Sequence, residues 1–233
     1  MNRWFALVLL MPLLAAAQQT ATSPSAAAQS ASVRFSFDWP QGIPWQEYSI
    51  EVQSDGKTHF DGTPNAGEAH DTDAYPQDFL MSEVNRQKIF ELSQKLNYFH
   101  GDFDSHLKHI AQTGRKTLEY RSPQIQGATT YNWSQNADVE ELTKLFEAIA
   151  MTIDYGRKLA FLYRFDKLGM DERLKELQDL QASHEVEEIG IIAPILRKIV
   201  NDPNMMNISR QTAKHLLQTM NGSGLAAQNP AQQ

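Results

Sequence analysis

The sequence predicts an α+β fold, in which a small antiparallel sheet built from two β-hairpins packs with helices and an all-helical C-terminal part follows. Two early segments alternate apolar and polar residues, which is the period of a half-buried strand. From Asn136 onward, apolar residues recur at intervals of three and four, which is the period of a helix. Of the 233 residues, about 200 remain without the N-terminal apolar segment, which is enough for one large domain or two small ones.

The first hairpin is predicted with a defined register. A three-residue loop at Ser54-Asp55-Gly56, with Gly56 left-handed, pairs Ile50 with Phe60 and Val52 with Thr58, so apolar residues share one face. A two-residue loop would set a glutamate opposite Phe60. We therefore predict the longer loop, which leaves His59 facing solvent opposite Glu51. The predicted strands are 33–39, 48–53 and 57–61.

A loop, a helix and a second hairpin are predicted next. Segment 61–77 is rich in Gly, Pro, Asp and Asn, which is typical of a loop. Ser82 is a suitable N-cap for a helix that Gly101 would end. The second hairpin joins strands 116–121 and 129–133 around a turn at 123–127, and it would bury Leu118, Tyr120, Tyr131 and Trp133.

The C-terminal part is predicted to be helical. Asn136 can cap a long helix whose buried stripe includes Gly156 and Ala160, a spacing that favours close approach of another backbone. The alternative is a mid-helix glycine that costs about 1 kcal/mol for no purpose. Gly169 would break this helix and Asp171 would cap the next. Two short apolar helices are expected between 185 and 220, with Pro194 at a first turn or a kink.

The N-terminal residues predict an exported protein. A short positive n-region precedes an apolar run from Trp4 to Ala17, which closes on a small-x-small cleavage site. The run is shorter than the about 20 residues of a membrane-spanning helix, so it fits a signal peptide at residues 1–17 better than an anchor. An N-terminal core helix is the alternative. We expect a periplasmic or secreted protein whose mature chain begins near Gln18.

The remaining chain is predicted to have four segments. Residues 18–32 are nearly all Gln, Thr, Ser and Ala, too few apolar side chains to offset the entropy of ordering, and predict a flexible leader. The tail at 221–233 is expected to be disordered for the same reason. Between them lie an α+β part at 33–135 and a helical part at 136–220, packed on the sheet.

Composition excludes several classes of function. The chain has no cysteine, so disulfides, thiol catalysis and thiolate metal sites are excluded. Its formal charge of −7 becomes −8 when Arg3 leaves with the signal peptide, which argues against nucleic acid as a partner. No later apolar stretch approaches spanning length, so the mature chain is expected to be soluble, without membrane insertion.

The best candidate for a metal site is the segment His100 to His109. A helix beginning at Asp102 would place Asp102, His106 and His109 on one stripe, a ligand set that zinc or iron would accept. Alternatively, Asp102 is a helix N-cap and the two histidines are ordinary polar residues. His70, Asp71 and Asp73 in the long loop could join such a site or simply form solvated turns.

No sequence motif identifies catalytic residues. Gly-x-Ser-x-Gly, His-Glu-x-x-His and a glycine-rich phosphate loop are all missing from the sequence. Ser-x-x-Lys occurs at Ser54 and at Ser105 without its companion motifs. We therefore predict no catalytic residues and expect no cofactor.

Two resemblances bear on the fold. Residues 191–217, with Ile191-Ile192-Ala193-Pro194-Ile195-Leu196 followed by Asp202 and Arg210, resemble one HEAT-type helical hairpin. The order hairpin, helix, hairpin, helix is similar to secreted bacterial domains of unknown function. These resemblances imply a fold and a location but no chemistry.

Three functions are compatible with the sequence. The first is a non-enzymatic interaction module that binds an envelope or extracellular macromolecule. The second is a metal-dependent hydrolase using the Asp102 stripe. The third is a small-ligand binder, with a pocket lined by Tyr48, Tyr120, Tyr131 and Trp133.

Overall fold

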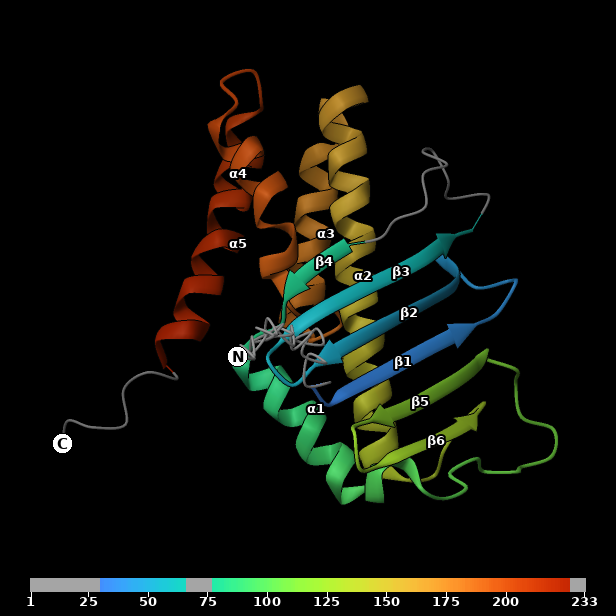
Figure 1. Ribbon diagram of the computed structural model, residues 1–233. Helices are drawn as coiled ribbons and strands as arrows, with labels where there is room; N and C mark the ends of the chain where they lie inside the picture. Colours follow the sequence, from blue (N-terminus) through green and yellow to red (C-terminus); the bar gives the residue numbers. More distant parts are fainter. Residues whose placement is uncertain (1–29, 66–76, 227–233) are drawn as a thin grey trace, which may run out of the picture.

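The computed structural model describes residues 30–65 and 77–226, and these residues form the predicted α+β fold. Helices α1 and α2 lie across one face of a six-stranded sheet, and α3 to α5 pack beside the far half of α2 (Figure 1). The predicted signal peptide, most of the predicted leader and segment 66–76 lie outside the described residues. The strands are β1 (Ser32–Asp38), β2 (Trp45–Gln53), β3 (Lys57–Pro64), β4 (Gln77–Leu80), β5 (Arg115–Arg121) and β6 (Gln126–Tyr131), and the helices are α1 (Glu83–Lys95), α2 (Ala137–Phe165), α3 (Met170–Ala182), α4 (Ala193–Asn201) and α5 (Asn207–Ala226).

The sheet is antiparallel throughout, with strand order β4-β3-β2-β1-β5-β6. The predicted register of the first hairpin is confirmed: Ile50 pairs with Phe60, Val52 with Thr58, and Gly56 has a φ of +88°. The two hairpins join through β1 and β5, where Phe35 pairs with Leu118. β1, the first strand in the sequence, therefore lies at the centre of the sheet.

Two strand predictions are wrong. β3 continues to Pro64 and β4 begins at Gln77, so strand pairing extends into both ends of the predicted loop 61–77. In the second hairpin the turn is shorter than predicted, because Ser122 N donates to Ile125 O at 2.8 Å and β6 begins directly afterwards. Trp133 lies beyond β6 and is 40% exposed rather than buried.

The inner face of the sheet packs on α2. Phe146 stacks on Phe35 with ring centroids 5.2 Å apart, and both are fully buried. Trp45 Nε1 donates to Ala150 O at 3.1 Å, which ties β2 to the same helix. Burial of large aromatic side chains supplies most of the stabilisation of such a core. We call it the sheet core.

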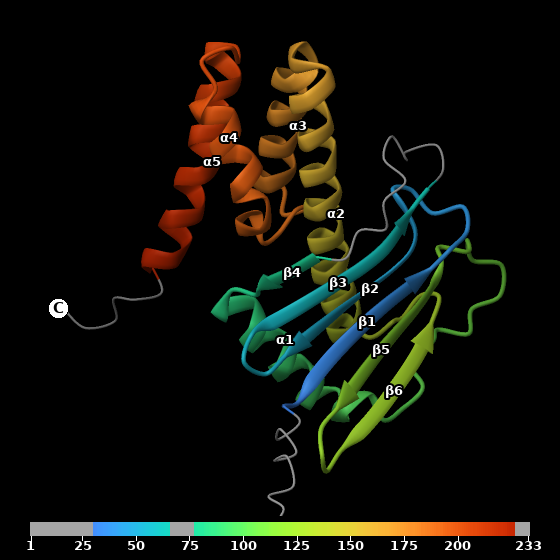
Figure 2. The ribbon, with the colours of Figure 1, turned by 45° about the horizontal axis from the view of Figure 1, so that its top comes forward.

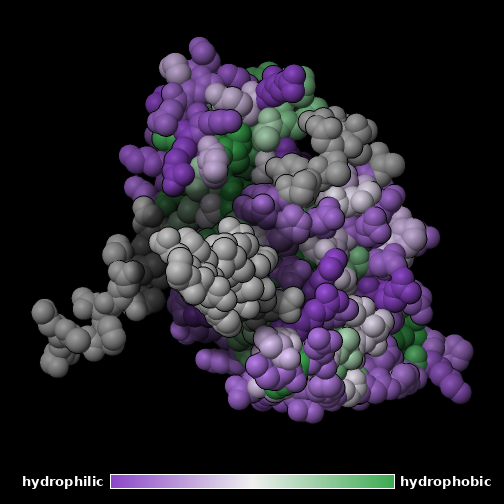
Figure 3. All heavy atoms as spheres, in the orientation of Figure 1, coloured by the Kyte–Doolittle hydropathy of each residue, from purple (hydrophilic) through white to green (hydrophobic). Residues whose placement is uncertain are grey.

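The outer face of the sheet is open and polar. In the orientation of Figure 1, the part of this face that is not covered by grey atoms is mostly hydrophilic (Figure 3). Thr117 and Thr130 lie opposite each other on it, with hydroxyl oxygens 3.0 Å apart. Among the described residues, helices cover one face of the sheet only, as in many antiparallel sheets.

Helix α1 begins as predicted and ends early. The Ser82 side chain accepts from Asn85 N, so the predicted N-cap is confirmed. The α-helix stops at Lys95, because a 3₁₀ turn at Asn97–Phe99 with left-handed backbone follows. Gly101 is therefore not the helix stop.

Helix α2 begins at the predicted cap and serves two cores. The Asn136 side chain accepts from the amides of residues 138 and 139. A β-carbon added at Gly156 would lie 2.6 Å from Ile192 Cγ2, so another element does approach closely there, through a side chain rather than a backbone. Ala160 is exposed, so its predicted burial is wrong. The second half of α2 contributes to a second core, which we call the helical core. Its buried leucines are Leu159, Leu174, Leu177, Leu196 and Leu216.

The other helix boundaries follow local capping. Asp166, rather than Asp171, caps the turn after α2, accepting from Leu168 N and Gly169 N. Pro194 lies in the first turn of α4, which is one of the two places predicted for it. Helix α5 runs antiparallel beside α4 and continues to Ala226, into the segment expected to be a tail (Figure 2). No helix among the described residues is both long and apolar enough to cross a membrane.

A buried charge lies on α2 between the two cores. Asp154 is fully buried, and its carboxylate contacts Lys158 Nζ at 2.8 Å and Arg157 at 3.3 Å. The Arg157 guanidinium lies over the Trp45 ring, 5.0 Å from its centroid. A buried carboxylate needs such compensation, because an uncompensated charge away from water is strongly destabilising.

Glu188 bridges the helical part to α1. Its carboxylate accepts from Ser82 Oγ at 2.5 Å and from Asn85 Nδ2 at 2.8 Å, at the positive N-terminal end of α1. The neighbouring Glu187 exchanges two backbone hydrogen bonds with the Thr152 hydroxyl on α2. Glu188 has a left-handed backbone, with a φ of 56°. We call Glu188 and Ser82 the latch.

Candidate functional site

The loop 100–114 carries the predicted metal ligands, but the helix predicted for it does not form. Asp102 Oδ1 accepts the backbone N–H of Asp104 at 3.1 Å, and Asp104 Oδ1 accepts that of His106 at 2.7 Å. Such side-chain bonds compete with helical hydrogen bonds. The prediction that Asp102, His106 and His109 share one stripe of a helix is therefore wrong. Asp102 is not a helix N-cap either.

Asn132, directly after β6, fastens this loop to the sheet. Its backbone N–H donates to Asp104 Oδ2 at 2.7 Å. Its side chain accepts from Thr113 N at 2.8 Å and donates to Ala111 O at 3.0 Å. One residue thus holds the loop near both ends. Sequence reasoning missed Asn132, because an asparagine after a strand is also typical of an ordinary turn.

Asp102 and His106 form an exposed ion pair. The carboxylate Oδ2 lies 2.6 Å from Nε2, and the two side chains are 67% and 70% exposed. The hydrogen bond between them lowers the pKa of Asp102 and raises the pKa of His106. Asp104 Oδ1 lies 3.6 Å from the other ring nitrogen, so both nitrogens face carboxylates. This favours the protonated imidazole, whereas a metal needs the neutral ring.

His109 is not brought into a metal cluster with this pair. Within residues 30–65 and 77–226, no group of three His, Asp or Glu side chains is placed to hold a metal ion. His70, Asp71 and Asp73, which could have supplied further ligands, lie outside the described residues. The described arrangement is an ion pair within a fastened loop.

Lys116 is a buried cation on the inner face of the sheet. Its side chain is 8% exposed, and Nζ donates to Asn132 O and Thr113 Oγ1, both at 3.1 Å. Burial lowers the pKa of Lys116 and raises the pKa of Glu147, whose carboxylate lies 4.0 Å away. Shifted pKa values of this kind mark candidate catalytic groups. Here protein oxygens surround the ammonium, so we assign it a structural role in holding loop 100–114.

The aromatic residues considered for a ligand pocket belong mostly to the sheet core. Tyr48, Tyr120 and Tyr131 are less than one-tenth exposed. The Tyr131 hydroxyl forms a hydrogen bond with Thr143 Oγ1 at 2.6 Å. These tyrosines pack against other core residues, and Trp133 lies outside the core.

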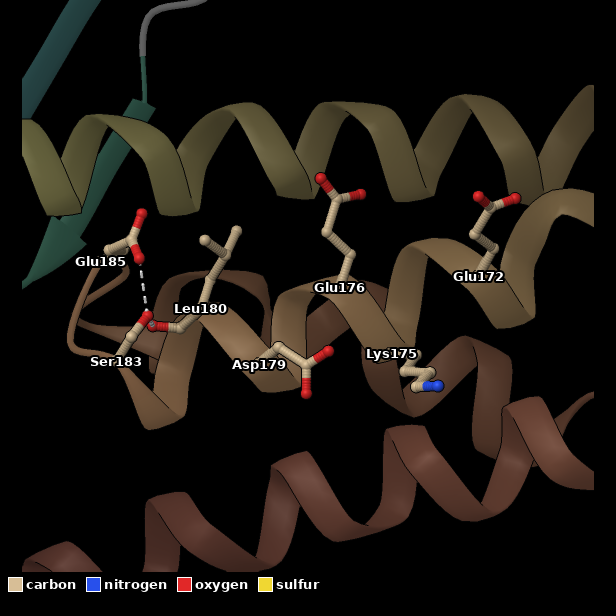
Figure 4. A pocket seen from close by; sticks show the side chains of 7 residues that line it. All are labelled: Glu172, Lys175, Glu176, Asp179, Leu180, Ser183 and Glu185. Atoms are coloured by element: carbon tan, nitrogen blue, oxygen red, sulfur yellow. Dashed lines mark hydrogen bonds between the residues drawn. The ribbon is translucent and has the colours of Figure 1, made fainter.

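Helix α3 and the turn after it line a shallow hollow of about 330 Å³ (Figure 4). Most of its ionisable side chains are acidic, which would favour a cation. Figure 4 shows the carboxylates pointing in different directions rather than toward one centre. The hollow therefore lacks the converging ligands of a built site. Its lining residues are Glu172, Lys175, Glu176, Asp179, Leu180, Ser183 and Glu185.

The end of the helical part far from the sheet exposes large apolar side chains. Phe165 and Leu168, where α2 turns into α3, are 61% and 80% exposed. Met206 and Ile208, where α4 turns into α5, are 38% and 55% exposed. Figures 1 and 2 both show these two turns at the same end of the molecule. We call these four residues the helical tip.

An ion pair holds the two turns of the helical tip together. Lys167 Nζ lies 2.6 Å from Asp202 Oδ2, and the same ammonium lies over the Tyr163 ring. The Arg164 guanidinium lies over the Phe165 ring, 4.8 Å from its centroid. The apolar side chains are thus presented from a fixed base. Large apolar side chains that are exposed on neighbouring turns can mark an interaction site.

Comparison with known proteins adds no family or function. No protein-family model matches the chain, and no curated protein matches it. Function is therefore inferred from the surfaces of the molecule.

Proposed function

We propose that this chain is an exported, non-enzymatic protein-interaction module, and that its helical tip binds an apolar surface on a partner protein of the bacterial envelope or exterior. The observation that carries the proposal is the exposure of Phe165, Leu168, Met206 and Ile208 on two linked turns. Apolar side chains exposed together have an energetic cost in water that binding removes.

Other features support this proposal. The N-terminal run from Trp4 to Ala17 has the composition of a signal peptide, which supports a partner outside the cytoplasm. The resemblance of 191–217 to a HEAT-type hairpin supports a role for α4 and α5 in contacts. Asp102 and His106 of loop 100–114 pair with each other, which favours binding over catalysis.

Site-specific photo-crosslinking tests the proposal. A photoreactive phenylalanine analogue at Leu168 or Ile208, expressed in the producing cell, is expected to give the same discrete adduct at both positions. The matched control is Lys214, an exposed residue of α5 away from the tip. Adding Phe165→Ser should reduce the tip adducts severalfold without changing the thermal midpoint, since Phe165 is mostly exposed.

The controls decide between specific and general contact. Equal adducts at Lys214 and Leu168, or tip adducts that survive Phe165→Ser, would contradict binding through the helical tip. Absence of any adduct at both tip positions would also contradict it.

A further inference from the structure

The outer edge of β6 is an open hydrogen-bonding edge. No described element lies beyond β6 in the strand order, and Figures 1 and 2 show it as the outermost strand on its side. The bond from Ser122 N to Ile125 O fixes the alternation of the β5–β6 ladder. By that alternation Gly127, Thr129 and Tyr131 bond to β5. The backbone groups of Gln126, Ala128 and Thr130 point away from the sheet.

Within residues 30–65 and 77–226, this edge lacks the protection that most natural edge strands have. Edge strands are usually very short, interrupted by proline or a bulge, or marked with charged side chains that prevent pairing. The opposite edge strand, β4, has four residues and carries an exposed aspartate, Asp78. β6 has six residues with no charge, no proline and no bulge: Gln126, Gly127, Ala128, Thr129, Thr130 and Tyr131.

The open edge also has a defined end. Asn132 N, which continues the outward series, donates to Asp104 Oδ2 at 2.7 Å, and Ser105 N donates to Trp133 O at 2.9 Å. Loop 100–114 therefore occupies the edge immediately after β6. Gln126 to Thr130 is left as a short segment centred on Ala128.

We propose that β6 pairs with β6 of a second copy of this chain, antiparallel about a two-fold axis at Ala128, so that the two sheets become continuous. Pairing about this axis places Ala128 opposite Ala128 and Gln126 opposite Thr130 of the other copy. Such an interface is self-complementary, as two-fold dimers require.

The charges near the edge allow this pairing. The three outward residues of β6 are uncharged. On neighbouring β5, Arg121 is neutralised by Glu119 at 2.9 Å and Arg115 by Asp38. Two copies can therefore approach without placing unpaired like charges opposite each other, although like charges directly opposite in a sheet are destabilising.

The contact is expected to be weak. One short strand pair buries less than the about 1,200 to 2,000 Å² of a standard stable interface. We expect a concentration-dependent dimer rather than an obligate one. This inference does not depend on the helical tip, which lies at the end of the helical part far from the sheet.

Sedimentation of the full mature chain over a wide concentration range tests the pairing. The unaltered chain is expected to show a reversible monomer–dimer equilibrium. Thr130→Lys should weaken association roughly tenfold or more, because an edge lysine prevents strand pairing. Thr117→Lys is the matched control: it lies opposite Thr130 on the same face and removes the same hydroxyl contact, but its backbone bonds lie inside the sheet.

A cysteine variant then tests which residues of the two β6 strands lie opposite each other. The chain has no cysteine, so Ala128→Cys introduces one thiol. Paired at the axis, its Cα atoms would lie about 5.5 Å apart, within disulfide range. Mild oxidation should give a disulfide dimer with Ala128→Cys and none with Thr117→Cys. A monomer at every concentration, equal weakening by both lysine variants, or capture of only an unrelated peptide at the edge would overturn the proposal.

Discussion

The sheet core and the helical core share one helix but are stabilised differently. The sheet core stacks large rings such as Phe35 and Phe146 against a ladder whose register leaves little freedom. The helical core is mostly aliphatic, with Leu174 and Leu177 packed between helices. Helix α2 contributes to both cores. We expect damage to the sheet core to destabilise the helical core, and damage to the helical core to leave the sheet core largely intact.

The largest effect is expected for Phe146→Ala. This side chain is fully buried and stacks on Phe35, so its removal should lower the free energy of unfolding by about 3–5 kcal/mol. Urea denaturation measures this loss, and hydrogen exchange should show both cores losing protection. Phe146→Leu is the control, with a smaller loss. A change below about 1 kcal/mol would contradict the assigned packing.

Leu177→Ala is expected to act on one core. Leu177 is fully buried in the helical core, and its truncation should cost about 2–5 kcal/mol locally. Hydrogen exchange should increase in α3 to α5, while β1 and β2 keep their protection. Leu168→Ala, at an exposed position, is the control and should change little. Equal loss of protection in the sheet would mean that the molecule has a single cooperative core.

The latch is expected to contribute less. Glu188→Ala removes hydrogen bonds to Ser82 and Asn85 and should cost roughly 1–2 kcal/mol, since the bonds are partly exposed to water. A double-mutant cycle with Ser82→Ala measures the coupling across the two parts. Glu185→Ala, in the same turn and exposed, is the control. Additive effects of Glu188→Ala and Ser82→Ala would contradict the latch.

The smallest effect on stability is expected for the Asp102–His106 pair. Asp102 raises the pKa of His106 above its ordinary 6.5, so the contribution of the pair is complete below about pH 6.5 and lost as the pH rises through the raised pKa. The lowered pKa of Asp102 means that the contribution also fades as the pH falls below its ordinary 3.8. An NMR titration should give a His106 pKa above 6.5 that returns toward 6.5 in Asp102→Asn. An unchanged titration would contradict the pairing.

The features that could be predicted from the sequence depend on neighbours along the chain. The pleat and Gly56 determine the hairpin register, because a one-residue slip would expose Ile50 and Val52. Ser82 and Asn136 were identifiable as caps because an N-cap bonds to amides two or three residues away. Such rules hold wherever the rest of the fold does not intervene.

The features that could not be predicted depend on residues far apart in sequence. Loop 100–114 avoids a helix because Asp102 and Asp104 bind nearby amides and Asn132 holds the result in place. Glu188 accepts a hydrogen bond from Ser82, which lies far from it in the sequence, and no local sequence pattern indicates this contact. The exposure of the helical tip could not be predicted, because the helical period of the sequence is compatible with Phe165 on either a buried or an exposed stripe.

The central position of β1 has a consequence for how the chain acquires its structure. β1 can form its hairpin with β2 as soon as residue 53 is available, but its other side waits for β5 and the pairing of Ser32 with Arg121. Contacts so distant in sequence slow folding, because the intervening chain must be closed into a loop first. A chain that emerges N-terminus first therefore carries a β1 with one unpaired side until residue 121 has been made. We expect docking of the second hairpin to limit its folding rate.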